Sequence, residues 1–431
     1  MKRPAWLTIV LLALVAFRVG GIVVAAISHT RGDYWSSMPG AYVQTVNPAL
    51  WDSPDLRGAM GFHRDTYYHG PIQYLTLYPL AYLDSYEQIA RVLLPIYAVV
   101  VAATIGCLLR VFRVLAPDVP FTVPVLSATL LFFPLLQAYL QREFEVVTLL
   151  GLAAALWLSV ADRRMGAGVV LACIAWFKYI PLLFAAYLAV RGWVRALAAF
   201  VLTSAAILIA AHALFGLSRF VNNNVPFHVA RVLAVFSYEF RTDATGDLVG
   251  FGFCADWYAK EAAAAGVRHG LCSVAARWPW LAPNVVYLVV CGVVALVYLT
   301  AHRRFERDRS ISPDRERWRR ALEFSILTTI CACFFFAHYY YLAALIVPLS
   351  VLLVRYLSRE DYRALALWAI SYMLVSAFVV PSRLLTPVLG ADAYSRYMQG
   401  SWFLWGELLL VALLLFEYVT LSRATAHSVG R

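Results

Sequence analysis

The chain is a succession of apolar runs, each about as long as a membrane is thick, separated by short loops that carry arginine. A helix needs about 20 apolar residues to cross a bilayer, and only helices and closed barrels can satisfy their backbone hydrogen bonds there. Hydrophobic residues make up 62% of the 431 residues and charged residues 14%, whereas soluble domains average about 45–50% and about 25%. The sequence therefore predicts an all-α polytopic membrane protein.

The positions of the basic residues predict the side of each loop, because cytoplasmic loops are enriched in Lys and Arg. Lys2 and Arg3 precede the first run, 5–27, which places the N-terminus in the cytoplasm. That run is too long for a signal-peptide core, so we expect it to be kept as the first helix. The C-terminus is also expected in the cytoplasm, after about ten full spans and two short helices. The expected full spans are about 5–27, 89–109, 121–140, 146–160, 196–215, 282–300, 321–341, 342–357, 364–380 and 402–421.

The net charge of +11 reflects the arginines that cluster in these short loops. No basic groove with stacking aromatic residues accompanies it, so the sequence excludes nucleic-acid binding. No soluble segment or internal repeat is visible, and residues 1–431 are expected to form a single integral membrane domain. Extracytoplasmic loops with interfacial helices are expected at about 28–88, 216–281 and 381–401.

The seven cysteines fall into two groups. Cys254 and Cys272 lie in the second long polar segment and could form a disulfide if that segment faces an oxidising compartment. The other five lie in expected helices as small core residues, and they are Cys107, Cys173, Cys291, Cys331 and Cys333.

One apolar stretch, 166–196, departs from the regular pattern. Lys178 lies near its middle and Pro181 follows closely, and a proline disfavours helix in the residue before it. Arginines flank the stretch at both ends, which indicates that both ends are cytoplasmic. We therefore expect two short helices that meet at an outward-pointing break near Lys178. The alternative is a single kinked span in which the Lys178 amine reaches the interface.

The most charged stretch, 302–320, reads HRRFERDRSISPDRERWRR. It could bind anionic lipid head groups, or it could serve as a cytoplasmic topology anchor, which is the interpretation we prefer.

Ionisable residues from separate helices map to the outer face. They are Asp33, Arg142, Glu143, Glu145, Lys178 and His338. Such residues at membrane depth are rare and usually functional. A base can deprotonate an acceptor hydroxyl while cations stabilise a phosphate leaving group, which suits chemistry on a phosphate-linked sugar. For Asp33 alone, a solvated loop acid is the alternative.

Aromatic residues surround the acids of the first loop. We expect them either to stack on sugar rings or to lie at the membrane–water interface. They are Tyr34, Trp35, Tyr67, Tyr68 and Tyr74. His63, Asp65 and His69 match no strong metal-ligand spacing, and the sequence has no P-loop, dinucleotide fingerprint or nucleophile elbow. We therefore expect neither a metal nor a cofactor.

Residues 151–200 resemble the central signature of the family 87 glycosyltransferases, bacterial membrane enzymes of the GT-C superfamily that include the mycobacterial polyprenyl-phosphomannose-dependent mannosyltransferases. The matching features are Lys178, Pro181, Tyr187 and RGWVRA. Three further segments are similar in the same order: RGDYW at 31–35, GPIQYLTLYPL at 70–80, and FFFAHYYYLAALIVP at 334–348 with His338 and Pro348. One segment departs: LQREFEV at 140–146 stands where the family has a Gly-Gln-Asn-like sequence.

The resemblance implies a GT-C fold in the inner (plasma) membrane of a bacterial cell, with the active site facing the periplasm. The enzyme would be a hexosyltransferase that moves a sugar, mannose in the family, from a polyprenyl phosphate to a cell-envelope glycolipid or polysaccharide, with inversion. Asp33 would be the base and Asp65 the reserve candidate. Lys178, His338 and Arg142 would lie near the donor phosphate, with Tyr34 and Tyr74 in substrate binding. The lipid-phosphate sugar is a substrate and not a cofactor, and membrane lipids are the other expected partner.

Two alternative functions are open to a membrane protein with this pattern. A transporter or flippase of a lipid-linked sugar would tend to show internal repeats and a site at the membrane midplane, and the sequence shows neither. A membrane scaffold without chemistry of its own is the second alternative.

Overall fold

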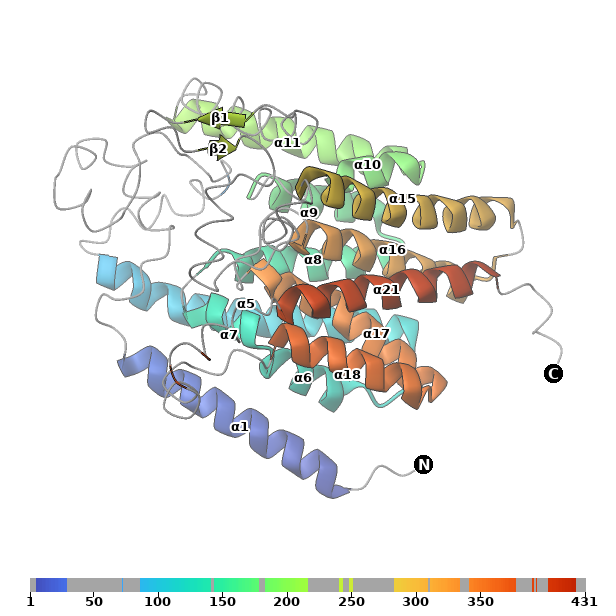
Figure 1. The fold of residues 1–431 in the computed structure, drawn as a ribbon. Coiled ribbons are helices and arrows are strands. Elements are labelled where there is room, and N and C mark those ends of the chain that lie inside the picture. Colours follow the sequence, from blue (N-terminus) through green and yellow to red (C-terminus); the bar gives the residue numbers. More distant parts are fainter. Residues whose placement is uncertain are drawn as a thin grey trace. The chain divides into compact units, whose positions relative to one another are not determined.

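The computed structural model describes residues 5–28, 72, 86–140, 143–177, 183–215, 240–242, 248–250, 283–308, 311–333, 341–376, 390, 393 and 402–423 (Figure 1). The chain divides into two compact units, each described by itself. The first comprises Met1–Val111 and Pro120–His228, and the second comprises Phe112–Val119 and Val229–Arg431.

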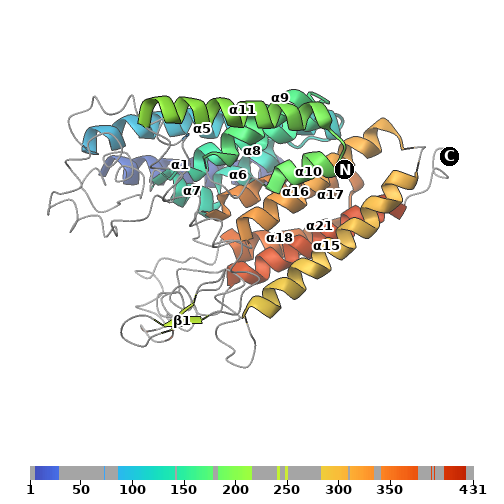
Figure 2. The same cartoon turned by 90° about the horizontal axis from the view of Figure 1, so that it is seen from above.

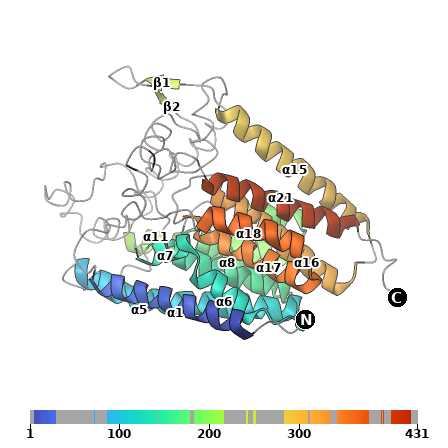
Figure 3. The same ribbon diagram turned by 60° about the horizontal axis from the view of Figure 1, so that its bottom comes forward.

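The first unit is helical in its described part. Its elements are α1 (Ala5–Ser28), α5 (Tyr86–Leu115, up to Val111 in this unit), α6 (Thr122–Leu130), α7 (Phe133–Leu140), α8 (Glu145–Val160), α9 (Arg164–Ala175), α10 (Leu183–Val190) and α11 (Val194–Phe215). Helix α9 packs against both α8 and α11 (Figure 2). Helix α1 packs against α6 and α7 (Figure 3).

Two glycines let α9 approach its neighbours closely. A Cβ atom on Gly151 of α8 would lie 2.0 Å from Cγ2 of Ile174, and one on Gly168 of α9 would lie 2.2 Å from the carbonyl oxygen of Ala196. The Ile174 side chain can change its rotamer, but the Ala196 oxygen belongs to the backbone of α11. Gly168 therefore sets the distance between α9 and α11.

We expect Gly168→Ala to lower the free energy of unfolding by about 3 kcal/mol, because the added methyl group forces α9 away from α11. Gly106→Ala in α5 is the matched control, since a Cβ there meets no atom within 4 Å. That control should raise stability by about 0.5–1 kcal/mol through helix propensity alone. Thermal unfolding of both purified variants tests the difference, and equal midpoints would contradict it.

The second unit is also mainly helical. Its elements are β1 (Phe240–Thr242), β2 (Leu248–Gly250), α15 (Pro283–Arg307), α16 (Pro313–Cys333), the 3₁₀ helix η4 (Tyr341–Leu345), α17 (Ile346–Arg359), α18 (Tyr362–Ser376) and α21 (Trp402–Arg423). Strands β1 and β2, of three residues each, pair antiparallel with Phe240 opposite Gly250. The described elements otherwise are helices, so the all-α class expected from the sequence fits. Helix α21 contacts α15, α16, α17 and α18.

Four of the described helices are long and apolar enough to cross a membrane, and the bent pair α6–α7 would make a fifth. The four are Arg91–Leu115, Val194–Ala213, Leu342–Arg359 and Trp402–Arg423. The protein is therefore a helical membrane protein. The larger number of about ten spans stays a prediction.

The expected straight span 121–140 is instead a pair of helices bent by 54°. Pro134 causes the bend, because it has no N–H to donate and its ring clashes with the carbonyl four residues earlier. Helix α6 ends where Leu131 donates to Ser127 O, and α7 begins at Phe133.

The stretch 166–196 folds as two short helices, α9 and α10, and not as one kinked span. The guanidinium of Arg164, at the start of α9, lies 5.0 Å from the ring centroid of Trp193, which follows α10. Helix α10 therefore brings the chain back to the end of the unit at which α9 begins. Gly192 makes this turn possible with a φ of +63°, because the N–H of Trp193 can then bond the carbonyl of Leu188.

Candidate active site

Three segments that the sequence singles out meet at one end of the first unit. The N–H of Ile72, from the 70–80 segment, donates to the carbonyl oxygen of Trp176 at 3.3 Å. The ring of Phe144, before α8, lies 4.9 Å edge-to-face from the ring of Phe177. Trp176 and Phe177 close the last turn of α9. Arg164 begins α9 and Arg191 follows α10, so the turns that carry arginine lie at one end of these helices. The meeting point lies at the opposite end of α9.

The turn between α7 and α8 carries two buried carboxylates. Glu143 is 7% exposed and Glu145 is 5% exposed. The N–H of Glu143 donates to Ala138 O at 2.8 Å, which keeps the turn tight. Glu145 stands in the first turn of α8, where the helix dipole favours a negative charge. Buried carboxylates are costly in an apolar protein, so this acidic pair marks the end as a candidate site.

Helix α5 holds this turn in place. The hydroxyl of Tyr139, near the end of α7, donates to the carbonyl oxygen of Leu94 at 3.2 Å. Tyr97, one turn further along α5, is buried and interacts electrostatically with Glu143.

Of the outer-face residues expected from the sequence, the structure describes Glu143 and Glu145 and shows both to be buried. The others lie outside the described residues, and they are Asp33, Tyr34, Asp65, Tyr74, Arg142, Lys178 and His338. The metal-ligand candidates His63 and His69 and the cysteines Cys254 and Cys272 also lie outside them. Of the other cysteines, Cys331 is buried, and Cys107, Cys173 and Cys291 are half-buried free thiols.

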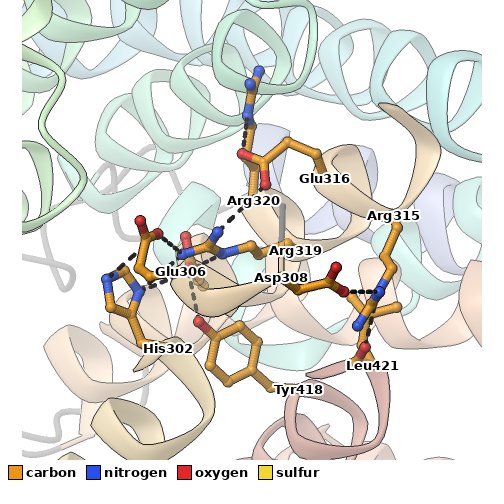
Figure 4. Close-up of polar contacts among 10 residues, drawn as sticks. His302, Glu306, Asp308, Arg315, Glu316, Arg319, Arg320, Tyr418 and Leu421 are labelled. Atoms are coloured by element: carbon orange, nitrogen blue, oxygen red, sulfur yellow. Dashed lines mark hydrogen bonds and ion pairs between the residues drawn. The ribbon is translucent and has the colours of Figure 1, made fainter. Parts of the chain in front are cut away.

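Sequence reasoning did not predict the buried ionic cluster in the second unit (Figure 4). The charged stretch 302–320 is largely helical, because α15 continues to Arg307 and α16 begins at Pro313. Arg319 is buried there, with Nε donating to Glu323 at 3.0 Å and Nη2 to Glu306 at 2.7 Å. The hydroxyl of Tyr418 on α21 also donates to Glu323, at 2.6 Å.

His302 completes this cluster, with Nδ1 lying 3.1 Å from Nη2 of Arg319. His302 Nδ1 also lies 3.5 Å from Oε1 of Glu323, and Nε2 lies 3.9 Å from Oε1 of Glu306. Acid–base pairs four residues apart, such as Arg319–Glu323 and Glu316–Arg320, are the signal that sequence reasoning could have used. The cluster lies at the arginine-bearing end of its helices.

The family model described as glycosyltransferase family 87 matches residues 67–335. That range is more than half of the chain, and it includes Ile72, the acidic turn and the α9–α10 pair. A search of curated proteins finds no significant match. The match agrees with the GT-C superfamily resemblance. The chain belongs to glycosyltransferase family 87, and it is a membrane glycosyltransferase.

Proposed function

We propose that the protein transfers a sugar from a polyprenyl-phosphate donor to a hydroxyl of a cell-envelope glycolipid or polysaccharide. By the family resemblance the sugar is mannose, and the reaction takes place on the extracytoplasmic face of a bacterial inner membrane. The observation that carries the proposal is the meeting of the 70–80 segment, the acidic turn and the end of α9 at one end of the first unit. That end is opposite the arginine-bearing turns, which are expected in the cytoplasm.

The proposed step is an in-line displacement at the anomeric carbon. The acceptor oxygen forms a bond to that carbon while its bond to the phosphate oxygen breaks, so the configuration inverts. The acceptor proton passes to a carboxylate, for which Asp33 is the first candidate and Asp65 the second. Polyprenyl phosphate leaves with the electron pair, and cationic side chains stabilise its charge.

Two cations are candidates for that role in the first unit. Lys178 directly follows Phe177, and Arg142 directly precedes Glu143. Consecutive Cα atoms are about 3.8 Å apart, and the rings of Phe144 and Phe177 are in contact. The sequence neighbours of Lys178 and Arg142 are therefore close together, which supports both cations as candidates for the donor phosphate. His338, outside the range of the family match, is the third candidate by resemblance.

The acidic pair, Glu143 and Glu145, is suited to a different part of the donor from the cations. A carboxylate repels a phosphate but accepts hydrogen bonds from sugar hydroxyls. Glu143 and Glu145 are therefore suited to the sugar side of the donor, and Lys178 and Arg142 to its phosphate side.

Sugar transfer by the purified protein in lipid tests the proposal, with a panel of polyprenyl-phosphate sugars and an envelope glycolipid extract as acceptor. Transfer from one donor, with inversion shown by NMR of the product, is the expected result. A folded protein that transfers no sugar from any donor, but moves a labelled lipid-linked sugar across vesicles, would overturn it in favour of transport.

We expect Lys178→Ala to raise the KM for the donor by about 10- to 100-fold, because a charge-assisted contact to the phosphate is lost. Lys178→Arg keeps the charge and should restore much of the affinity. Steady-state kinetics with varied donor and fixed acceptor measures the effect. An unchanged donor KM in the alanine variant would remove Lys178 from the site.

A further inference from the structure

Four exposed arginines gather at the arginine-bearing end of the second unit. Arg303, Arg304 and Arg307 occupy the last turns of α15, and Arg423 ends α21. Within the described part of the chain, none of the four forms an ion pair. We call these four residues the arginine patch.

The nearby acids are engaged by other arginines. Glu306 binds Arg319 at 2.7 Å, and Asp308 binds Arg315 at 2.6 Å. Glu316 also binds Arg320, at 3.0 Å. These acids are therefore paired with other arginines, and the patch keeps its positive charge. A helix C-terminus attracts cations, but that attraction does not neutralise three arginines on one helix.

Arg315 holds the helices that carry the patch together. Its Nη1 binds Asp308 after α15, its Nε donates to the carbonyl oxygen of Leu421 at 3.0 Å, and its Nη2 donates to that of Ser422 at 3.3 Å. The ends of α15 and α21 are therefore joined through the start of α16, as Figure 4 shows for Arg315, Asp308 and Leu421. Arg423 directly follows Ser422, so it belongs to the same corner as the α15 arginines.

The exposed face of α15 changes from apolar to cationic along its length. Val289, Val293 and Leu296 are 57%, 55% and 67% exposed, and they share one face of the helix with Arg303 and Arg307 because their spacings are three, four and seven residues. An apolar stripe that ends in two arginines matches a phospholipid, whose acyl chain is apolar and whose head group is anionic. A soluble phosphate would contact only the arginines.

We propose that the arginine patch binds the phosphodiester head groups of anionic phospholipid, with the acyl chains along the exposed stripe of α15. The lipid lies in the leaflet at the arginine-bearing end, which is expected to be the cytoplasmic one. Anionic lipids are abundant in that leaflet. The binding is independent of the sugar-transfer reaction.

Native mass spectrometry of the purified protein, titrated with phosphatidylglycerol or phosphatidylcholine in detergent, tests this proposal. We expect the wild type to retain phosphatidylglycerol preferentially. The triple variant R303Q/R304Q/R307Q should bind it about 100-fold more weakly, because each basic residue near an anionic surface contributes about a five-fold effect. Glycerol phosphate at the same concentration should not compete, since it lacks the acyl chain.

Two controls separate lipid binding from folding. R303K/R304K/R307K keeps the charge and should keep the preference, and R195Q removes an exposed arginine of the first unit and should leave it unchanged. All variants should unfold at similar temperatures in phosphatidylcholine. Equal retention of phosphatidylglycerol by the wild type and the folded triple glutamine variant, or competition by glycerol phosphate, would overturn the proposal.

Discussion

Substituting Asp33 by asparagine is expected to lower the rate of sugar transfer by about two to four orders of magnitude, the usual contribution of a general base. Asparagine is nearly isosteric with aspartate but cannot take a proton from the acceptor hydroxyl. The loss should therefore appear in kcat, while the KM for the donor changes little. Transfer by purified Asp33→Asn in lipid, compared with wild type at saturating donor, measures it.

The matched control is Asp65→Asn, which changes the reserve candidate in the same way. If Asp33 is the base, Asp65→Asn should keep a rate within about ten-fold of wild type. The reverse outcome, with Asp33→Asn active and Asp65→Asn inactive, would move the base to Asp65. Near-wild-type rates in both folded variants would contradict base catalysis by either residue.

The second large effect is expected for Glu417→Ala in the second unit. Glu417 of α21 is buried and binds Arg355, which is 5% exposed, and Arg359 at 2.8 Å, both on α17. Arg355 also stacks on the ring of Trp318, so it cannot easily turn to solvent. Removing the carboxylate leaves a buried guanidinium without its counter-ion, which should cost about 3–5 kcal/mol. Thermal unfolding in lipid measures this loss.

An exposed ion pair provides the comparison for Glu417. Arg164 and Asp162 form a pair at 2.8 Å with side chains 41% and 64% exposed, and such pairs contribute about 0–1 kcal/mol. Asp162→Asn should therefore change stability little, and asparagine also tolerates the φ of +61° at this position.

The double variant Arg355→Leu/Glu417→Leu should recover most of the stability that Glu417→Ala loses, because no buried charge then lacks a partner. A small effect of Glu417→Ala would show that water reaches Arg355.

Much of the helical framework could be predicted from the sequence. The run 146–160 is α8 at 145–160, and the run 402–421 is α21 at 402–423. The two short helices α9 and α10 were also predicted, because a proline and two sets of flanking arginines are local signals. The bend in 121–140 was missed, although Pro134 is visible in the sequence, since the apolar composition of that run is continuous.

The candidate site could be predicted only as a list of residues on one face. Periodicity and the distribution of arginine assign residues to a membrane side, but they give no distances. The structure joins Ile72 to Trp176 and Phe144 to Phe177, and it shows that Glu143 and Glu145 are buried. The roles of Asp33, Lys178 and His338 stay predictions.

The sequence by itself determined that this protein is a helical membrane protein, because twenty apolar residues in a row can satisfy their backbone only as a helix in a bilayer. Only the tertiary structure decided what the charged stretch 302–320 does. There, α16 and α21 pack so that Arg319 and Glu323 meet Tyr418 in the interior, while Arg303 and Arg307 stay on the surface. Charged side chains from one region of the sequence thus have opposite environments, because burial depends on which helix faces which neighbour.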